Sequence, residues 1–157
     1  MPGNRGEEKT SVVWFYSLAA AVVLLDQFTK FLAVRFLAPQ DSLPLLPSIF
    51  HLTFVRNRGI AFGLFNGHPS LLLILITASL AVLIYLGIKM KESPVLQRWA
   101  FALILGGALG NWIDRVCYGA VIDFLDFRVW PVFNFADTAI SAGVGLYLLS
   151  FMKAEKK

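Results

Sequence analysis

The sequence contains an uncharged run of nineteen residues, Ser70–Ile88, which limits the possible folds more than any other feature. A helix rises about 1.5 Å per residue, so this run can cross roughly 28 Å, close to the thickness of bilayer hydrocarbon. Lys89 follows the run, and Pro94 prevents the helix from continuing far beyond it. The run therefore predicts a membrane-spanning helix over residues 70–88.

Three further apolar segments, at about 12–37, 97–115 and 134–152, have similar lengths. Over the whole chain 57% of residues are apolar and 15% charged, against about 45–50% and about 25% in soluble domains. We therefore expect an all-α polytopic membrane protein with four transmembrane helices in a single domain, 1–157. A cleaved signal peptide is the rival interpretation of the first segment. That segment is long for a signal peptide, and no small-x-small cleavage site precedes a polar start.

The segments between these spans are predicted to lie outside the hydrocarbon, at 38–69 and 116–133. The first contains prolines and glycines together with Phe50–Val55, whose alternation is typical of a strand. Ile60–Phe65 is its predicted partner across a turn, so we expect a small extracytoplasmic β element after the first helix. Residues 118–132 are predicted to form a loop. The polar residues at 1–10 are expected to be disordered.

The distribution of lysine and arginine predicts the orientation of the chain. The termini and the 89–98 connection carry eight basic and four acidic residues, whereas the remainder carries six of each. Because cytoplasmic loops are enriched in basic residues, both termini, including the 1–11 tail, are predicted to be cytoplasmic. The formal net charge of +4 equals the cytoplasmic excess, so it does not indicate a nucleic-acid partner.

Ionisable residues within the spans need an explanation, because a charge in hydrocarbon costs several kcal/mol unless it is paired or hydrated. At about 1.5 Å per residue, Asp26, Asp114 and Asp137 each lie roughly 22–25 Å from the cytoplasmic ends of their helices. Three aspartates on three helices therefore share one level near the outer interface. Asp123 follows Asp114 by nine residues and can reach the same level.

Each of these residues also has an ordinary structural interpretation. Asp26 and Lys30 are four residues apart, a spacing at which they could neutralise each other. Asp114 could support the fold by pairing internally. Asn134 and Asp137 stand at a predicted helix start, where an isolated aspartate is more often a cap than a catalyst.

The loop residues are open to similar alternatives. Asn57 and Gly59 could serve only in a turn. Arg56 and Arg58 could contact lipid phosphates or simply be solvated, and the 126–128 segment is most simply loop surface.

The polar residues as a set favour one chemistry over others. Both histidines, His51 and His68, lie in the predicted outer β region, which argues against a Ser/His/Asp triad, and the chain has no P-loop and no HExxH motif. The small number of zinc ligands, one cysteine and two histidines, argues against a zinc site, so no metal and no cofactor are expected. Two neighbouring aspartates, one protonated and one ionised, can act as acid and base toward a water. A proton- or ion-coupled carrier, or a non-catalytic membrane assembly protein, would also accommodate these carboxylates.

Five short motifs occur in order along the spans and the segments beside them. They are Asp26-Gln-Phe-Thr-Lys30, Asn57-Arg-Gly-Ile-Ala-Phe-Gly63, Gly106-Gly-Ala-Leu-Gly-Asn-Trp-Ile-Asp-Arg115, Val121-Ile-Asp-Phe124 and Phe133-Asn-Phe-Ala-Asp137. With these motifs, residues 12–152 resemble the bacterial lipoprotein signal peptidases, also called type II signal peptidases.

The resemblance implies an aspartic endopeptidase of the bacterial cytoplasmic (inner) membrane with its active site toward the outer side. Such enzymes remove signal peptides from prolipoproteins by cutting before a diacylglyceryl-modified cysteine, in contact with membrane lipid, and are inhibited by globomycin-type peptides. The resemblance implies that Asp123 and Asp137 form the catalytic pair. It also implies a set of supporting or substrate-binding residues: Asp26, Lys30, Asn57, Gly59, Asn111, Asp114, Arg115 and Asn134.

Overall fold

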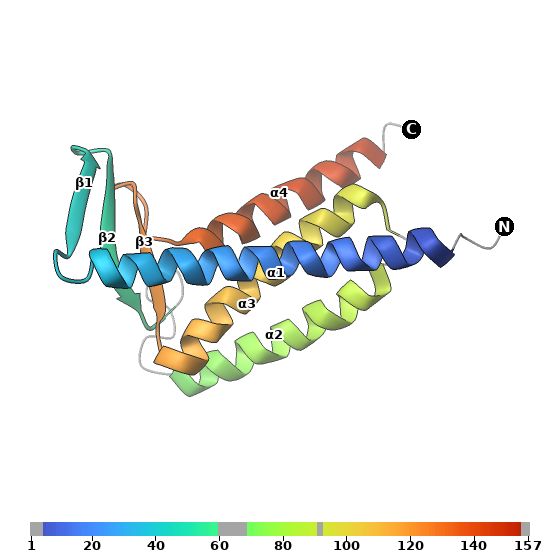
Figure 1. Ribbon diagram of the computed structural model, residues 1–157, viewed down its shortest axis with the longest axis horizontal. Helices are drawn as coiled ribbons and strands as arrows, with labels where there is room; N and C mark the ends of the chain where they lie inside the picture. The colour runs from blue at the N-terminus through green and yellow to red at the C-terminus, as the bar shows by residue number, and fades with distance from the viewer. Residues whose placement is uncertain (1–4, 60–68, 91–92, 155–157) are drawn as a thin grey trace.

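The structure, a computed structural model, describes residues 5–59, 69–90 and 93–154, with side chains over 12–59, 69–90 and 93–152. Four long helices and three strands follow one another along the chain (Figure 1). In order they are α1 (Arg5–Phe36), β1 (Ser42–Leu46), β2 (Phe50–Asn57), α2 (Pro69–Lys89), α3 (Val95–Tyr118), β3 (Val121–Asp126) and α4 (Phe135–Ala154).

The four predicted helices are confirmed, and each contains a stretch long and apolar enough to cross a membrane. These stretches are Val12–Phe36, Pro69–Lys89, Val95–Tyr118 and Phe135–Met152. The expectation of disorder over 1–10 is wrong for the part that the structure describes, since α1 begins at Arg5. Glutamate and lysine, which are frequent there, are good helix formers and let the helix extend beyond its apolar part.

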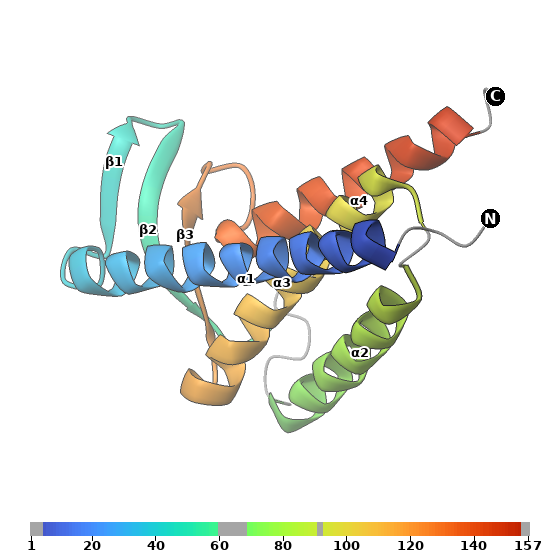
Figure 2. The same cartoon turned by 45° about the vertical axis from the view of Figure 1, so that its right-hand side comes forward.

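The sheet lies at one end of the helices, and the Arg5 end of α1 and the Ala154 end of α4 both lie at the opposite end (Figures 1 and 2). Its order is β1-β2-β3, with both pairs antiparallel. The predicted strand at 50–55 is confirmed within β2. The predicted partner at 60–65 lies outside the described residues, and in the described sheet β2 is flanked by β1 and β3.

The prediction of a loop over 118–132 is wrong for residues 121–126, which form β3. Its two aspartates made the segment resemble a loop in the sequence. In the structure Ile122 and Phe124 alternate onto one face and pack with Ala33 and Leu37 near the end of α1. That burial, together with pairing to β2, makes the segment a strand.

Glycines let α3 pack closely between α1 and α4. A Cβ on Gly106 would lie 2.7 Å from the Ala19 carbonyl oxygen of α1, and one on Gly107 would collide with the Ala136 carbonyl of α4. On α4, a Cβ on Gly143 would lie 2.6 Å from the Ala100 carbonyl oxygen. These close approaches bring the polar residues at the sheet end of three helices within hydrogen-bonding distance.

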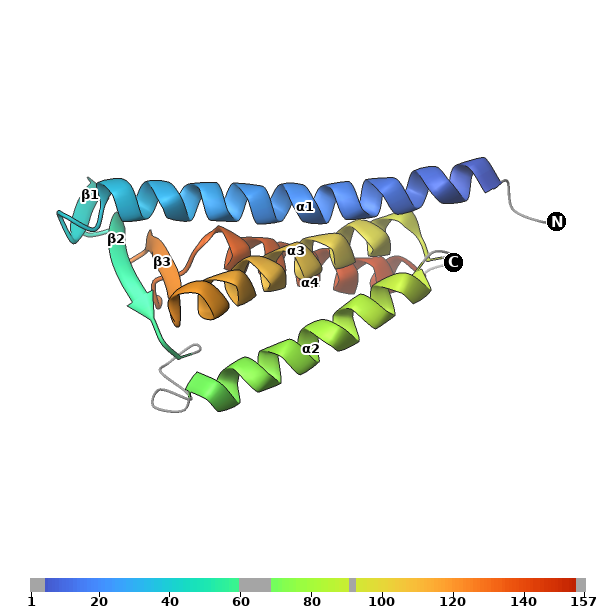
Figure 3. The same cartoon turned by 60° about the horizontal axis from the view of Figure 1, so that its bottom comes forward.

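Helix α2 is held mainly against α3. Leu80 joins Phe101 and Leu105 in a buried apolar cluster, and the Trp112 indole donates to Thr77 Oγ1 at 3.0 Å. Toward the sheet end α2 diverges from α1 (Figure 3). The polar site is therefore built from α1, α3, α4 and the sheet.

Candidate active site

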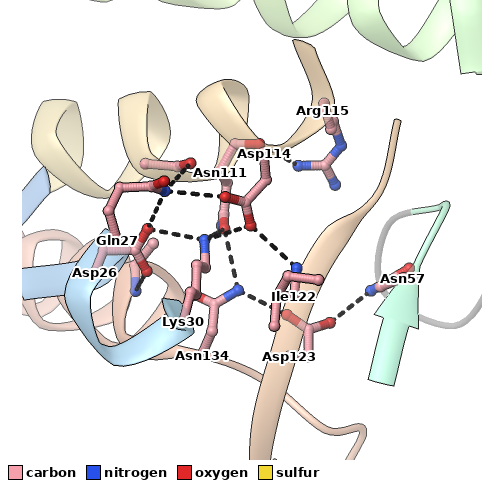
Figure 4. A network of polar contacts seen from close by, with 12 residues as sticks. Asp26, Gln27, Lys30, Asn57, Asn111, Asp114, Arg115, Ile122, Asp123 and Asn134 are labelled. Carbon is pink, nitrogen blue, oxygen red and sulfur yellow. Dashed lines mark hydrogen bonds and ion pairs between the residues drawn. The ribbon is translucent and has the colours of Figure 1, made fainter. Parts of the chain in front are cut away.

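Lys30 is the central cation of a buried polar network (Figure 4). Its side chain is 3% exposed, and its ammonium lies 2.8 Å from Asp26 Oδ2 and 2.9 Å from Asp114 Oδ2. It also donates to Asn111 Oδ1 at 2.9 Å. An ammonium has three protons, so each finds an acceptor. Asp26 and Asp114, which were predicted to share one level, therefore meet at Lys30.

The two aspartates use their remaining acceptor sites on backbone and amide groups. Asp26 Oδ1 accepts from the Ala136 backbone N–H at 3.0 Å, which satisfies a donor in the first turn of α4. Asp114 Oδ2 accepts from the Ile122 backbone N–H at 3.0 Å, which ties β3 to α3. Gln27 donates to Asp114 Oδ1 at 2.9 Å and to Asp26 Oδ2 at 3.2 Å. The buried charges therefore join three helices and the strand.

A left-handed residue at the end of α3 makes this arrangement possible. Gly119 has φ +67°, and its N–H donates to the Arg115 carbonyl at 3.1 Å. This helix-ending geometry suits glycine because it lacks a Cβ. The chain then turns back, so β3 runs beside the last turns of α3.

Two asparagines connect the Lys30 network to Asp123 and Asp137. Asn134 Nδ2 donates to Asn111 Oδ1 at 3.0 Å and to Asp123 Oδ1 at 2.6 Å. Asn111 Nδ2 donates to Asp137 Oδ1 at 2.8 Å. The Asn134 amide therefore holds Oδ1 of Asp123, and the Asn111 amide holds Oδ1 of Asp137.

Asp137 is held by the local structure at the start of α4. Its N–H donates to Asn134 Oδ1 at 3.0 Å, and its Oδ2 accepts from the Asn134 N–H at 3.2 Å. This reciprocal pair is a capping box. Its other oxygen accepts from Asn111. The Asp137 carboxylate therefore caps α4 and also belongs to the polar site.

Asp123 lies on β3, outside the spans, and is 2% exposed. Burial raises the pKa of Asp123 to about 6, against the lowering effect of hydrogen bonds from Asn57 and Asn134. The negative charge of Asp137 raises this pKa further. Among the described residues no hydrogen bond joins the two carboxylates directly.

Asn57, Gly59 and Arg115 complete the side of the site facing β2. Asn57 Nδ2 donates to Asp123 Oδ2 at 2.9 Å, while its Oδ1 accepts from the Gly59 N–H at 3.0 Å. Arg115 Nη2 donates to the Gly59 carbonyl at 3.0 Å and Nη1 to the Asn111 carbonyl at 3.2 Å. Arg115 therefore joins the end of α3 to the segment that follows β2.

The structure thus brings all ten predicted site residues into one connected network. The prediction missed Gln27, although it follows Asp26 directly. A residue at i+1 on a helix points about 100° away from its neighbour. No sequence pattern indicates that α3 crosses where Gln27 can reach Asp114 and the Gly110 carbonyl.

The prediction that Asp126 lies on a loop surface is also wrong, because its side chain is buried. It accepts from Thr53 Oγ1 at 2.8 Å and from the Arg128 N–H at 2.8 Å. Burial alone would raise the pKa of Asp126, but these bonds and the Arg128 guanidinium hold it below its usual value. Arg128 has φ +65°, and its bonds to Asp126 fix the turn that leads from β3 toward Asn134.

Known proteins resemble this chain over most of its length. The family described as signal peptidase (SPase) II matches residues 18–153. Among curated relatives, a lipoprotein signal peptidase of Halothermothrix orenii is 40% identical over 90% of this chain and 97% of its own length. A lipoprotein signal peptidase of Caldanaerobacter subterraneus subsp. tengcongensis is 46% identical over 85% of this chain and 94% of its own length. One of Brevibacillus brevis is 43% identical over 92% of this chain and 99% of its own length.

Solved structures agree with the sequence comparisons. Two bacterial membrane enzyme structures determined by the in meso method, at 2.3 Å and 1.9 Å, are each 31% identical to this chain over 92% of its length. Their TM-scores are 0.73 and 0.74, and 88% and 94% of those chains are covered. The chain therefore belongs to the signal peptidase II family of aspartic peptidases and is a multi-pass bacterial membrane protein.

Proposed function

We propose that this protein cleaves the signal peptide of prolipoproteins immediately before a diacylglyceryl-modified cysteine, using Asp123 and Asp137 to activate a water. The observation that carries the proposal is the attachment of both carboxylates to Asn134. Asn134 donates to Asp123 through its side chain and to Asp137 through its backbone N–H. The proposed water lies between the two carboxylates.

The environments of the two aspartates suggest different roles. Asp123 is buried, and its pKa is raised to about 6, so it is the proposed holder of the shared proton. Asp137 accepts hydrogen bonds from Asn111 and the Asn134 N–H, an arrangement that suits a carboxylate.

The proposed reaction follows from this division. Asp137 accepts a proton from the water while the water oxygen attacks the scissile carbonyl carbon. Asp123 donates its proton to the carbonyl oxygen. As the C–N bond breaks, the proton on Asp137 passes to the leaving nitrogen, and the hydroxyl proton of the intermediate returns to Asp123. Each aspartate then has its starting protonation state.

The surrounding residues are proposed to hold this pair rather than to react. Lys30 neutralises Asp26 and Asp114, which in turn fix the start of α4 and β3. Asn111 orients Asp137, and Asn57 orients Asp123. These contacts are the structural basis for the proposed supporting roles of Asn111, Asn134 and their partners.

The position of the site suits a lipidated substrate. The network lies where the helices meet the sheet, so a scissile bond could meet water while a signal helix and two acyl chains stay in lipid. We propose that the termini are cytoplasmic and that this end faces the outer side of the inner membrane. Globomycin-type peptides would then compete at the same site.

The experiment that tests this function uses purified full-length protein in lipid bilayers with a synthetic prolipoprotein. We expect cleavage directly before the modified cysteine, little cleavage of the same peptide without the diacylglyceryl group, and no effect of EDTA. Mass spectrometry of the products identifies the bond. Cleavage at another bond, or dependence on an added metal, would contradict the proposal. A parallel flux assay tests the carrier alternative, for which proton or ion movement without a peptide product is the expected outcome.

A further inference from the structure

A second cavity lies away from the aspartate pair, between α1, α3 and the sheet. Its volume is about 370 Å³, which is within the range of small-molecule sites. Phe31 and Val34 of α1 form one wall, Tyr118 of α3 another, and Phe54 and Arg56 of β2 the side toward the sheet. The cavity is therefore mostly apolar, with a cation at the edge that meets the sheet.

The strand register places this cavity on the opposite face of the sheet from Asp123. Arg56 pairs with Ile122, and Val55 pairs with Asp123. Directly opposed residues point to the same face of an antiparallel pair, and successive residues point to opposite faces. Arg56 and Ile122, which both line the cavity, therefore face away from the side on which Asp123 points. The cavity therefore lies across the sheet from the Asp123 side chain, although Lys30 and Asp114 of the site network line it.

The polar floor of the cavity offers no free charge to a ligand. Lys30 already binds Asp26, Asp114 and Asn111. Asp114 is in addition an acceptor for Gln27 and for the Ile122 N–H. These groups are bonded to one another inside the protein, with one ammonium shared between two carboxylates.

Arg56 at the rim is different. Its side chain is exposed, and among the residues that the structure describes no hydrogen bond or ion pair engages its guanidinium. An arginine fork binds a phosphate through paired N–H donors. The unpaired cation of the cavity lining therefore lies at its sheet end.

The apolar wall and Arg56 belong to different elements. Phe31 and Val34 belong to the Val12–Phe36 stretch that can cross a membrane, and they are 62% and 46% exposed. Arg56 belongs to β2, which is not part of that stretch. A ligand that fills the cavity therefore needs an apolar chain against Phe31 and Val34 and an anionic group toward Arg56.

We propose that this cavity binds a membrane phospholipid, with an acyl chain against Phe31 and Val34 and the phosphate on Arg56. The lipid comes from the leaflet that meets the sheet. Because Ile122 lines the cavity and its N–H is bonded to Asp114, the bound lipid also packs against β3. Binding is measured without any cleavage, so the proposal stands or falls independently of the peptidase activity.

The test measures lipid binding to the detergent-solubilised full chain by thermal unfolding and by native mass spectrometry. Phosphatidylglycerol is the probe, and diacylglycerol with the same chains and sodium phosphate are the two comparison ligands. We expect phosphatidylglycerol to raise Tm and to remain bound in the mass spectrometer. Diacylglycerol lacks the phosphate and sodium phosphate lacks the acyl chains. Neither ligand should therefore raise Tm or remain bound in the mass spectrometer.

Variants locate the site. Arg56→Gln should weaken phosphatidylglycerol binding about fivefold, because one basic side chain near a lipid surface contributes about 1 kcal/mol. Val34→Trp should also weaken it by filling the cavity at an already exposed position. Arg35→Gln is the matched control, since Arg35 is exposed on the same helix and does not line the cavity.

Three results would overturn the proposal. The first is unchanged phosphatidylglycerol binding in both Arg56→Gln and Val34→Trp. The second is an equal Tm increase with diacylglycerol or with sodium phosphate. The third is an Arg35→Gln loss as large as that of Arg56→Gln, because a diffuse surface attraction would then explain the binding.

Discussion

At the scale of single residues, the site depends on side chains that each serve two neighbours. Asn134 caps α4 through Asp137 and donates to Asp123. Asn111 accepts from Lys30 and donates to Asp137. Because a buried polar group without a partner costs about 1–3 kcal/mol, a change at one residue is transmitted to the next. The catalytic geometry and the stability of this end of the bundle are therefore linked.

The pH dependence of cleavage should respond to Asn57. Its hydrogen bond lowers the pKa of Asp123, so Asn57→Ala should raise that pKa above about 6. If protonated Asp123 is the acid, activity is lost as pH rises through this pKa, and the variant should keep activity to higher pH. The measurement is kcat/KM from about pH 5 to about pH 9.

Thr53→Ala is the control for that profile. Thr53 lies on the same strand but donates to Asp126, not to Asp123, so its alkaline limb should match the wild type. An alkaline limb that stays in place, or moves to lower pH, in Asn57→Ala would show that Asp123 does not hold the proton.

Lys30 should be necessary for folding because it is the buried partner of two carboxylates. Lys30→Met leaves Asp26 and Asp114 unpaired, which is expected to cost about 3–5 kcal/mol and to lower Tm strongly. Adding Asp26→Asn to Lys30→Met should recover part of that loss by removing one uncompensated charge. Arg35→Gln, at an exposed position, should change stability by less than about 0.5 kcal/mol. A Lys30→Met protein as stable as the wild type would refute this account of the network.

At the scale of elements, α3 is the scaffold, because its glycines set how near α1 and α4 approach. Gly110 is the critical position, since a Cβ there would collide with the Asp26 carboxylate. The displacement would separate Asp26 from the Ala136 N–H and from Lys30. The close packing of helices and the polar site are therefore one structural feature.

Gly110→Ala should consequently lower both Tm and cleavage rate. The matched change is Gly145→Ala on α4, where an added Cβ meets nothing within 4 Å. That variant should be neutral or more stable by up to about 1 kcal/mol, from helix propensity alone. Thermal unfolding and a cleavage assay on both proteins check this, and equal effects of the two substitutions would mean that the collision with Asp26 is unimportant.

The sequence predicted the elements that have a strong local signal and missed those that depend on tertiary contacts. The four spans follow from apolar length, and the strand at 50–55 follows from alternation. Strand β3 was missed because its two aspartates resemble loop chemistry, whereas the burial of Ile122 and Phe124 against α1 decides its conformation. Gln27 and Asp126 were missed for the same reason, since their partners lie on other elements.

At the scale of the whole molecule, the sheet and both described chain ends lie at opposite ends of the helices (Figure 1). The charge asymmetry predicts that the end with the termini faces the cytoplasm. The chain has one cysteine, Cys117, which is exposed near the sheet end of α3. It is a natural reporter of orientation.

A membrane-impermeant maleimide should therefore label Cys117 in intact spheroplasts. The control combines Cys117→Ser with Met152→Cys. It moves the thiol from the sheet end of α3 to an exposed position near the C-terminal end of α4, which lies away from the sheet (Figure 1). This protein should be labelled only after lysis. The reverse pattern would place the sheet in the cytoplasm and would contradict the proposed access of prolipoproteins to the site.

The central claim, that Asp123 and Asp137 act together on a water, is tested most directly by the single-turnover cleavage rate of a lipidated prolipoprotein. The proteins to compare are Asp123→Asn, Asp137→Asn and the double variant, at equal amounts of folded protein. Each single variant should lose at least about 10²-fold in rate, and the double variant should be little worse than either, because the pair acts as a unit. Asp41→Asn is the control, since Asp41 is exposed and its φ of +60° suits asparagine; it should retain the full rate. A single variant at Asp123 or Asp137 that keeps most of the wild-type rate would contradict the account.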